Sequence, residues 1–271
     1  MDQKHKAEAF AALHHTGDIL ILPNAWDAAS AAVMADAGAK AVATSSAAVA
    51  WGHGYPDGDV LPLNLLLQTI SAVARAAGDT PVTADIEGGY TDDFATLAET
   101  IKAVIGAGAV GINLEDGRRD PDLHARKIEA ARKAADATGV PLFINARTDV
   151  YLKGLAEGHA AYVETTARAE RYRGAGASGI FVPGPSDADL IDRLADEIKL
   201  PLNIMLLPGL PKAEQLQALG VRRVSSATAP FRAAYATVAN ATVEFLKDAD
   251  PAAFAVDAAR LGNLNKRFGQ D

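Results

Sequence analysis

Acidic side chains stand at the ends of apolar segments in this sequence. Asp85 ends the run PVTAD, and Glu87 follows it closely. Glu115 ends the run VGINLE, and Asp57 lies in a glycine-rich loop, WGHGYPDGD. Buried carboxylates are costly unless a partner compensates their charge. Carboxylates that converge need a cation between them, and oxygen ligands without cysteine favour Mg²⁺ or Mn²⁺. These four acids are therefore predicted to form a Mg²⁺ or Mn²⁺ site.

A basic residue and a histidine could complete such a site. Arg147 ends the run LFINAR, and its guanidinium fork can bind two oxygens of one carboxylate. Opposite the predicted metal, it would suit a substrate that carries a carboxylate. His53 lies in the glycine-rich loop and is the histidine with the best claim to a role in the site.

Other polar residues have simpler interpretations. Asp27 is either a helix N-cap or a site residue, and Asp120 is interpreted as a cap because it precedes a helical pattern. Three further acids are interpreted as caps or solvated loop residues: Asp92, Asp93 and Asp116. The histidines in helical patterns are interpreted as surface residues: His14, His15, His124 and His159.

Short apolar runs alternate with longer helical patterns along the chain. The runs span residues 18–22, 41–45, 81–85, 110–115, 142–147, 179–183, 201–205 and 222–226. The helical patterns span 27–37, 61–77, 93–107, 123–138, 156–175, 187–198, 211–219 and 229–248. Repeated strand–helix units predict a parallel sheet, and a run of eight favours a (β/α)8 TIM barrel over a doubly wound open sheet. In such barrels functional groups lie at the carboxyl ends of the strands, which is where the acids fall.

The composition narrows the class of protein. The chain of 271 residues is 49% hydrophobic, contains no cysteine and has a formal net charge of −8. We therefore expect no disulfide and no thiolate metal site, and the acidic balance argues against a nucleic-acid surface. The first residues predict an amphipathic helix rather than a signal peptide, and no apolar run reaches the ~18 residues of a membrane span. A single cytoplasmic domain over 1–271 is expected, with 251–271 as a C-terminal helical extension.

A series of motifs occurs in order along nearly the whole chain. They are PNAWDAASA (23–31), TSSAAVAWGHGYPDGD (44–59), TADIEGGY (83–90), INLEDG (112–117), INARTDVYL (144–152), LNIMLLPG (202–209) and ATAPFRAA (227–234). Together they resemble the isocitrate lyase and phosphoenolpyruvate mutase superfamily. The resemblance implies a barrel with Mg²⁺ at its mouth that acts on 2-oxo acids through an enolate. It also implies a homotetramer in which a C-terminal helix packs on a neighbouring subunit, a role that 251–271 would fit.

The resemblance also implies roles for individual positions. Asp85 matches the direct metal ligand. The acids that match positions acting largely through metal-bound water are Asp57, Glu87 and Glu115. The predicted substrate-binding residues are Trp26, Ser45, Ser46, Ala47, Asp57, Arg147 and Asn203. Among them, Ser45 and the backbone N–H groups of Ser46 and Ala47 match the positions that hold the substrate carboxylate.

The segment after Glu115 departs from the superfamily pattern. The lyases carry a Lys-Lys/Arg-Cys-Gly-His motif there, whose cysteine is the acid–base residue. This chain has DGRRDPDLHARK (116–127) instead, and Pro183 stands where the lyases have glutamate and the mutase has histidine. Candidates for the missing acid, or for a contact to a second carboxylate, are Arg118, Arg119, His53 and Tyr90.

Three functions remain open at this stage. The first is a Mg²⁺-dependent lyase or decarboxylase for a small 2-oxo or 2-hydroxy di- or tricarboxylic acid. Its predicted catalytic residues are Arg147, Glu115, Arg118 and His53. The second is cleavage or rearrangement of a P–C bond in a phosphonate such as phosphonopyruvate. The third is a 2-oxo acid-binding protein with little turnover.

Overall fold

Nine parallel strands form a nearly closed barrel in the computed structural model, which describes residues 1–255 and 261–269. The strands are β1 (Leu20–Leu22), β2 (Asn24–Ala25), β3 (Val42–Thr44), β4 (Val82–Asp85), β5 (Gly111–Glu115), β6 (Phe143–Arg147), β7 (Gly179–Val182), β8 (Leu202–Met205) and β9 (Arg223–Ser225). Their order is β1-β9-β8-β7-β6-β5-β4-β3-β2. The predicted (β/α)8 barrel is confirmed, and the alternative of an open doubly wound sheet is wrong.

The first predicted strand is broken in two at Pro23. β1 pairs with β9, whereas β2 pairs with β3. Proline has no N–H to donate to a ladder, but the Pro23 carbonyl still accepts a hydrogen bond from the Ala43 N–H at 2.9 Å. The two halves of this strand therefore connect both ends of the sheet.

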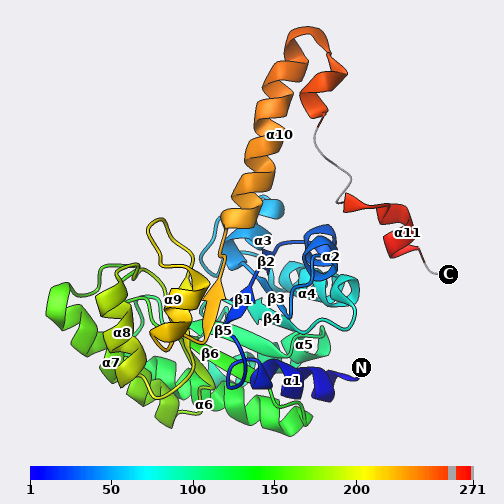
Figure 1. Cartoon of the computed structure of the whole chain (residues 1–271). Coiled ribbons are helices and arrows are strands. Elements are labelled where there is room, and N and C mark those ends of the chain that lie inside the picture. The colour runs from blue at the N-terminus through cyan, green and yellow to red at the C-terminus, as the bar shows by residue number, and fades with distance from the viewer. Residues whose placement is uncertain (256–260, 270–271) are drawn as a thin grey trace.

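Helices surround the strands (Figure 1). They are α1 (Gln3–Ala12), α2 (Ala28–Asp36), α3 (Ser46–Gly52), α4 (Leu63–Ala77), α5 (Phe94–Gly106), α6 (Pro121–Thr138), α7 (Gly158–Gly174), α8 (Ala188–Glu197), α9 (Ala213–Ala218), α10 (Ala229–Asp248), the 3₁₀ helix η1 (Pro251–Phe254) and α11 (Leu264–Phe268). Each predicted helix is present, with ends that shift by a few residues. The short α3 was not predicted, because seven residues rich in alanine carry no clear helical period.

The register of the strands brings the predicted site residues to one end of the barrel. Asp85 is the Cα partner of Asn113, and Glu115 is the partner of Arg147. The opposite end is covered by α1, whose Phe10 ring lies 5.6 Å from the ring of Phe143 at the start of β6. Burial of apolar side chains between strands and helices supplies the core.

The outer face of β1 is left open. Ile21 is 63% exposed, although outward residues of other strands, such as Ile112 and Ile180, are fully buried. The helix that follows β9 in the chain, α10, would be expected to cover this face of β1. Instead, α10 points away from the barrel (Figure 1). Ala241 is the buried residue of α10. Among the described residues, no helix is both long and apolar enough to cross a membrane.

The predicted C-terminal extension is helical in part. η1 and α11 fall within 251–271, and the rest of that prediction, at 256–260 and 270–271, lies outside the described residues. The charged Arg267 of α11 contacts Asp36 of α2 at 3.0 Å.

Candidate active site

Asp85 is a buried carboxylate at the carboxyl end of β4. The residue is 8% exposed. Its Oδ1 accepts a hydrogen bond from the Glu87 N–H at 3.1 Å. Burial raises the pKa of Asp85 to about 7, against the opposing charge of Arg147 and with the support of the Glu115 charge. No cation contacts this carboxylate among the described residues. A bound cation would therefore stabilise it strongly.

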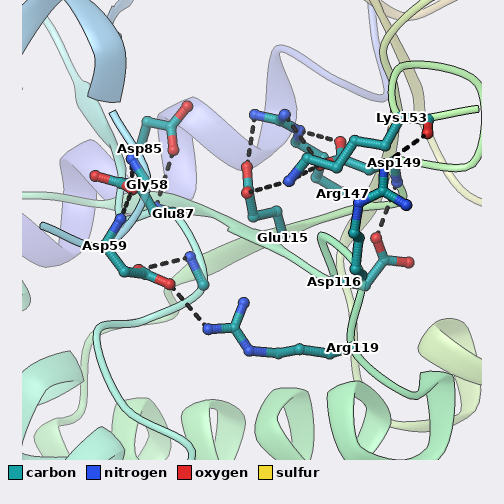
Figure 2. Close-up of polar contacts among 12 residues, drawn as sticks. Gly58, Asp59, Asp85, Glu87, Glu115, Asp116, Arg119, Arg147, Asp149 and Lys153 are labelled. Carbon is teal, nitrogen blue, oxygen red and sulfur yellow. Dashed lines mark hydrogen bonds and ion pairs between the residues drawn. The ribbon is translucent and has the colours of Figure 1, made fainter. Parts of the chain in front are cut away.

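Glu87 is fixed by the loop that carries Asp57. Its Oε2 accepts hydrogen bonds from the Gly58 N–H at 2.8 Å and from the Asp59 N–H (Figure 2). Its Oε1 accepts one from the Tyr90 hydroxyl at 3.0 Å. Burial raises the pKa of Glu87, and these hydrogen bonds oppose that rise. Asp57 is exposed, and its charge also raises the pKa of Glu87. The two acids therefore belong to one cluster.

A reciprocal contact holds the two loops together. Asp59 accepts hydrogen bonds from the N–H groups of Gly88 at 3.1 Å and Tyr90 at 3.2 Å. Asp59, Glu87 and Tyr90 have positive φ angles of 58°, 52° and 62°. Such backbone strain in non-glycine residues persists only where surrounding contacts impose it, and it concentrates at functional sites.

Arg119 completes this contact from the segment after β5. Its Nη2 lies 2.9 Å from Asp59 Oδ2 (Figure 2). Its Nε lies 2.9 Å from Asp92 Oδ1. Glycine at position 88 makes room for this contact, because a Cβ there would displace the Arg119 guanidinium and the Asp59 carboxylate. Arg119 is thus occupied in ion pairs, and it joins three loops of the barrel mouth.

Glu115 and Arg147 form an ion pair at the ends of β5 and β6. Arg147 Nη1 lies 2.7 Å from Glu115 Oε2, and Arg147 Nε lies 2.7 Å from Asp149 Oδ1. Burial lowers the pKa of Arg147, but the charges of Glu115 and Asp149 more than offset this, so the pKa is raised. Burial also raises the pKa of Glu115, against the opposing charge of Arg147. The two side chains therefore form a fixed ion pair beside Asp85.

Two residues of this ion-pair network were not predicted from the sequence. Asp149 binds Arg147, and Lys153 Nζ lies 3.0 Å from Asp149 Oδ2 and 3.4 Å from Glu115 Oε1. Asp149 is fully buried, and Lys153 is partly exposed. The only signal in the sequence is the spacing in INARTDVYLK, where Asp149 follows Arg147 by two residues and precedes Lys153 by four.

Asp116 is a buried structural acid. It accepts hydrogen bonds from the Asp149 N–H at 2.9 Å, from Arg168 Nη1 at 2.8 Å and from the Tyr172 hydroxyl at 2.7 Å. The interpretation of Asp116 as a cap or solvated residue is wrong, because the residue is fully buried. Its contacts connect α7 to the backbone of Asp149, and so to Arg147.

The predicted binding residues for a substrate carboxylate lie at the end of β3. Ser45 is the N-cap of α3, and its Oγ accepts a hydrogen bond from the Ala48 N–H at 3.4 Å. Ser46 and Ala47 open the same helix and are buried. Asn203 lies inside the barrel on β8, where its Nδ2 donates to Ser225 Oγ at 3.4 Å.

Three predicted site residues have their contacts elsewhere. His53 Nε2 lies 2.8 Å from Thr69 Oγ1 on α4. The ring of Trp26 packs at 5.3 Å against Phe231 at the base of α10. Arg118 is exposed, and its Nη2 donates to the Lys153 carbonyl at 3.2 Å. No contact joins these side chains to the acid cluster within the part of the chain that the structure describes, so their roles stay predictions.

The simpler interpretations of polar residues have mixed outcomes. Helix caps are confirmed for Asp27, Asp93 and Asp120. Two histidines assigned to the surface are instead buried: His14 is 1% exposed and His124 is fully buried. Burial lowers the pKa of each to about 3. Both are therefore neutral near neutral pH.

The donor chemistry of this mouth fits a hard divalent cation held by few protein oxygens. Within residues 1–255 and 261–269, no three acidic or histidine side chains lie close enough to enclose a metal ion. Mg²⁺ commonly takes one or two carboxylates and keeps several waters. Among the described residues Asp85 has no cationic partner in contact, whereas Glu115 pairs with Arg147 and Glu87 accepts hydrogen bonds from the Gly58 N–H and the Tyr90 hydroxyl. Asp85 as the direct ligand, with the other acids further out, is compatible with this arrangement.

These features define a TIM-barrel enzyme with an acidic site at the carboxyl ends of its strands. A family model described as phosphoenolpyruvate phosphomutase matches residues 10–246. The chain belongs to this family, within the phosphoenolpyruvate mutase/isocitrate lyase superfamily of lyases and mutases. The predicted resemblance is confirmed.

Individual relatives point to several activities. An uncharacterized protein of Mycobacterium tuberculosis strain H37Rv is 37% identical over 239 residues, which cover 86% of this chain and 87% of that protein. The oxaloacetate decarboxylase of Pseudomonas entomophila is 28% identical, over 83% of this chain and 80% of that enzyme. A crystal structure from Burkholderia cenocepacia J2315, provisionally described as a phosphonomutase, is 41% identical with a TM-score of 0.85, over 90% of this chain and 99% of that one.

Proposed function

We propose that the protein is a Mg²⁺- or Mn²⁺-dependent lyase for small 2-oxo or 2-hydroxy di- or tricarboxylic acids. It would cleave a C–C bond, by decarboxylation or retro-aldol cleavage, through an enolate. The observation that carries this proposal is the buried Asp85 carboxylate beside the Glu115–Arg147 ion pair. The similarity to an oxaloacetate decarboxylase supports it.

The acids would hold the metal in two different ways. Asp85 would bind it directly, and Asp57, Glu87 and Glu115 would act largely through water. When bound, the metal would polarise the 2-oxo group and stabilise negative charge on its oxygen. Arg147 carries a permanent charge that the Glu115 and Asp149 carboxylates hold in place. Its field favours an anionic substrate and the enolate that forms from it.

The remaining predicted residues would orient the substrate. Ser45, with the N–H groups of Ser46 and Ala47, would hold the carboxylate next to the 2-oxo group, and Asn203 would contact the substrate from inside the barrel. Arg118 would attract a second carboxylate, because it is exposed and has no acidic partner among the described residues. Trp26 and His53 would take part only after a change in their present contacts.

For oxaloacetate the bond changes are simple. The bond between the methylene carbon and the distal carboxylate breaks, and its electron pair passes to the methylene carbon as an enolate. Carbon dioxide leaves, and a proton from water gives pyruvate. This sequence needs no acid–base cysteine, in keeping with a chain that has none.

A substrate panel tests the proposal. Purified protein with Mg²⁺ would be mixed with oxaloacetate, isocitrate, methylisocitrate and phosphonopyruvate, and pyruvate, glyoxylate and phosphate would be measured. A protein-free Mg²⁺ blank is needed, because metal ions alone polarise 2-oxo acids. Metal-dependent pyruvate or glyoxylate above the blank supports a lyase. Phosphate release from phosphonopyruvate alone would refute it.

A P–C bond enzyme is the second candidate. The 41% identity to the Burkholderia cenocepacia protein described as a phosphonomutase favours it. The same enolate-stabilising groups would serve, because the bond that breaks lies next to the same enolate. Binding of 2-oxo acids without turnover of any compound in the panel would instead indicate a binding protein.

The assembly we propose is a homotetramer. We assign the helix that packs on a neighbouring subunit to α10, whereas the superfamily resemblance gave this role to 251–271. Ile21 forms part of two grooves, of about 460 Å³ beside Met34 and about 500 Å³ beside Gln217. The apolar side chains Val243 and Leu246 of α10 are 60% and 76% exposed. Large exposed apolar surfaces mark interfaces, and a second copy of α10 would cover the open face of β1.

A further inference from the structure

Arg223 is a charged residue inside the barrel, below the acid cluster. It opens β9 and is 1% exposed. Its Nη2 donates to Asn113 Oδ1 at 3.3 Å, on the far side of the barrel interior. Asn113 is also the Cα partner of Asp85 in the neighbouring strand. The guanidinium therefore contacts the residue next to the predicted metal ligand.

The charge of Arg223 is not neutralised by contact. Its Nε and Nη1 have no hydrogen-bond partner among the described residues, and no carboxylate there forms an ion pair with it. A buried charge without a partner costs several kcal/mol. A barrel interior is ordinarily filled by branched apolar residues, so this arginine is a costly exception.

The field of this charge reaches in both directions along the barrel. Toward the mouth, it acts on Asp85, whose negative charge in turn favours the charged form of Arg223. Toward the closed end, it helps to lower the pKa of His14, after burial. A fixed positive charge below the site opposes a divalent cation above it and attracts an anion.

We propose that Arg223 is a specificity-determining residue that weakens binding of Mg²⁺ alone and strengthens binding of a dianionic ligand at the same mouth. The metal would then bind well only together with an anionic substrate, whose charge balances that of the arginine. This inference rests on the proposed function, because it uses the metal site at Asp85.

Calorimetry on charge variants tests this inference. Mg²⁺ alone, and oxalate in the presence of saturating Mg²⁺, would be titrated into the wild type, Arg223→Gln and Arg223→Lys. Gln removes the charge and can still donate to Asn113, whereas Lys keeps the charge. In Arg223→Gln, Mg²⁺ should bind about tenfold more tightly and oxalate about tenfold more weakly. Arg223→Lys should stay within about threefold of the wild type for both ligands.

The opposite signs separate an electrostatic role from a structural one. A distorted site would lose affinity for both ligands, and that result would overturn the proposal. Equal Mg²⁺ binding by the wild type and Arg223→Gln would overturn the proposal for Arg223. It would leave the proposed metal site unaffected. No Mg²⁺ binding by any of the three proteins would overturn it together with the metal site.

Unfolding in urea supplies a second readout. Loss of an uncompensated buried charge should leave the unfolding midpoint of Arg223→Gln equal to or above that of the wild type. A variant that fails to fold would show that the arginine is a structural residue, and would overturn the proposal. The effect on Mg²⁺ should also persist in about 0.5 M KCl, because salt screens buried charges poorly.

Discussion

Replacing Asp116 with alanine should destabilise the protein strongly. Asp116 is fully buried and accepts three hydrogen bonds, one of them in an ion pair with Arg168. The substitution would leave Arg168 Nη1, the Tyr172 hydroxyl and the Asp149 N–H without their acceptor, and Arg168 would keep only its ion pair with Glu164, at 2.7 Å through Nε. Removing one partner of a buried ion pair costs about 3–5 kcal/mol of unfolding free energy. We expect a loss in this range.

The variants around Asp116 form a graded series. Tyr172→Phe removes one hydrogen bond to a charged acceptor and should cost about 1.5–3 kcal/mol. The double variant Asp116→Leu with Arg168→Met removes both charges, so its loss should be clearly smaller than the sum of the two single losses. Both expected losses depend on the burial of the Asp116–Arg168 ion pair.

Urea unfolding followed by circular dichroism measures these losses. The matched control is Glu170→Ala, which breaks an ion pair with Arg173 of similar length, 2.6 Å, on the exposed side of α7. Exposed pairs contribute about 0–1 kcal/mol. If Asp116→Ala lost no more than Glu170→Ala, the reasoning that links burial to the value of this network would be refuted.

Three further predictions concern pH, the loop contact and assembly. The folded state keeps His14 and His124 neutral because burial lowers each pKa from 6.5 to about 3, so stability should fall as pH drops from 6.5 toward 3, by about 2 kcal/mol per histidine at about pH 5. His124→Leu should reduce this loss in urea unfolding at about pH 5 against about pH 7; an unchanged loss would argue against a neutral His124. Arg119→Met should lower the metal-dependent rate about 10- to 100-fold, since it frees the loops that hold Glu87, whereas the exposed Arg173→Met should not; equal rates would remove Arg119 from the positioning of the site. Ile21→Glu places a charge in the proposed groove for α10 and should lower the mass measured by light scattering; an unchanged mass would exclude this face from the interface.

The barrel and its acidic mouth could be predicted because both depend on local patterns. A buried parallel strand requires a continuous apolar run, so a charged residue that ends such a run marks the mouth. Asp85, Glu115 and Arg147 were found in this way. The break at Pro23 could also have been read from the proline, which cannot donate to a ladder.

The partners of these residues could not be predicted, because contacts between side chains depend on how separate loops fold together. Arg118 and Arg119 are adjacent in the sequence, yet one is exposed and the other joins Asp59 to Asp92. His14 lies on the segment that covers the end of the barrel, where its ring stacks 3.9 Å from that of Phe143. Helical position alone does not tell which face another element covers, so the surface assignment of this histidine failed.

The most direct test of the metal site compares the wild type with Asp85→Asn in Mg²⁺-dependent release of pyruvate from oxaloacetate, corrected for the protein-free blank. The exposed Asp122→Asn serves as the control. We predict a loss of about 100-fold or more for Asp85→Asn, with no loss of stability, and no loss of rate for the control. Metal-dependent turnover by Asp85→Asn at the wild-type rate would contradict the assignment of Asp85 as the metal ligand.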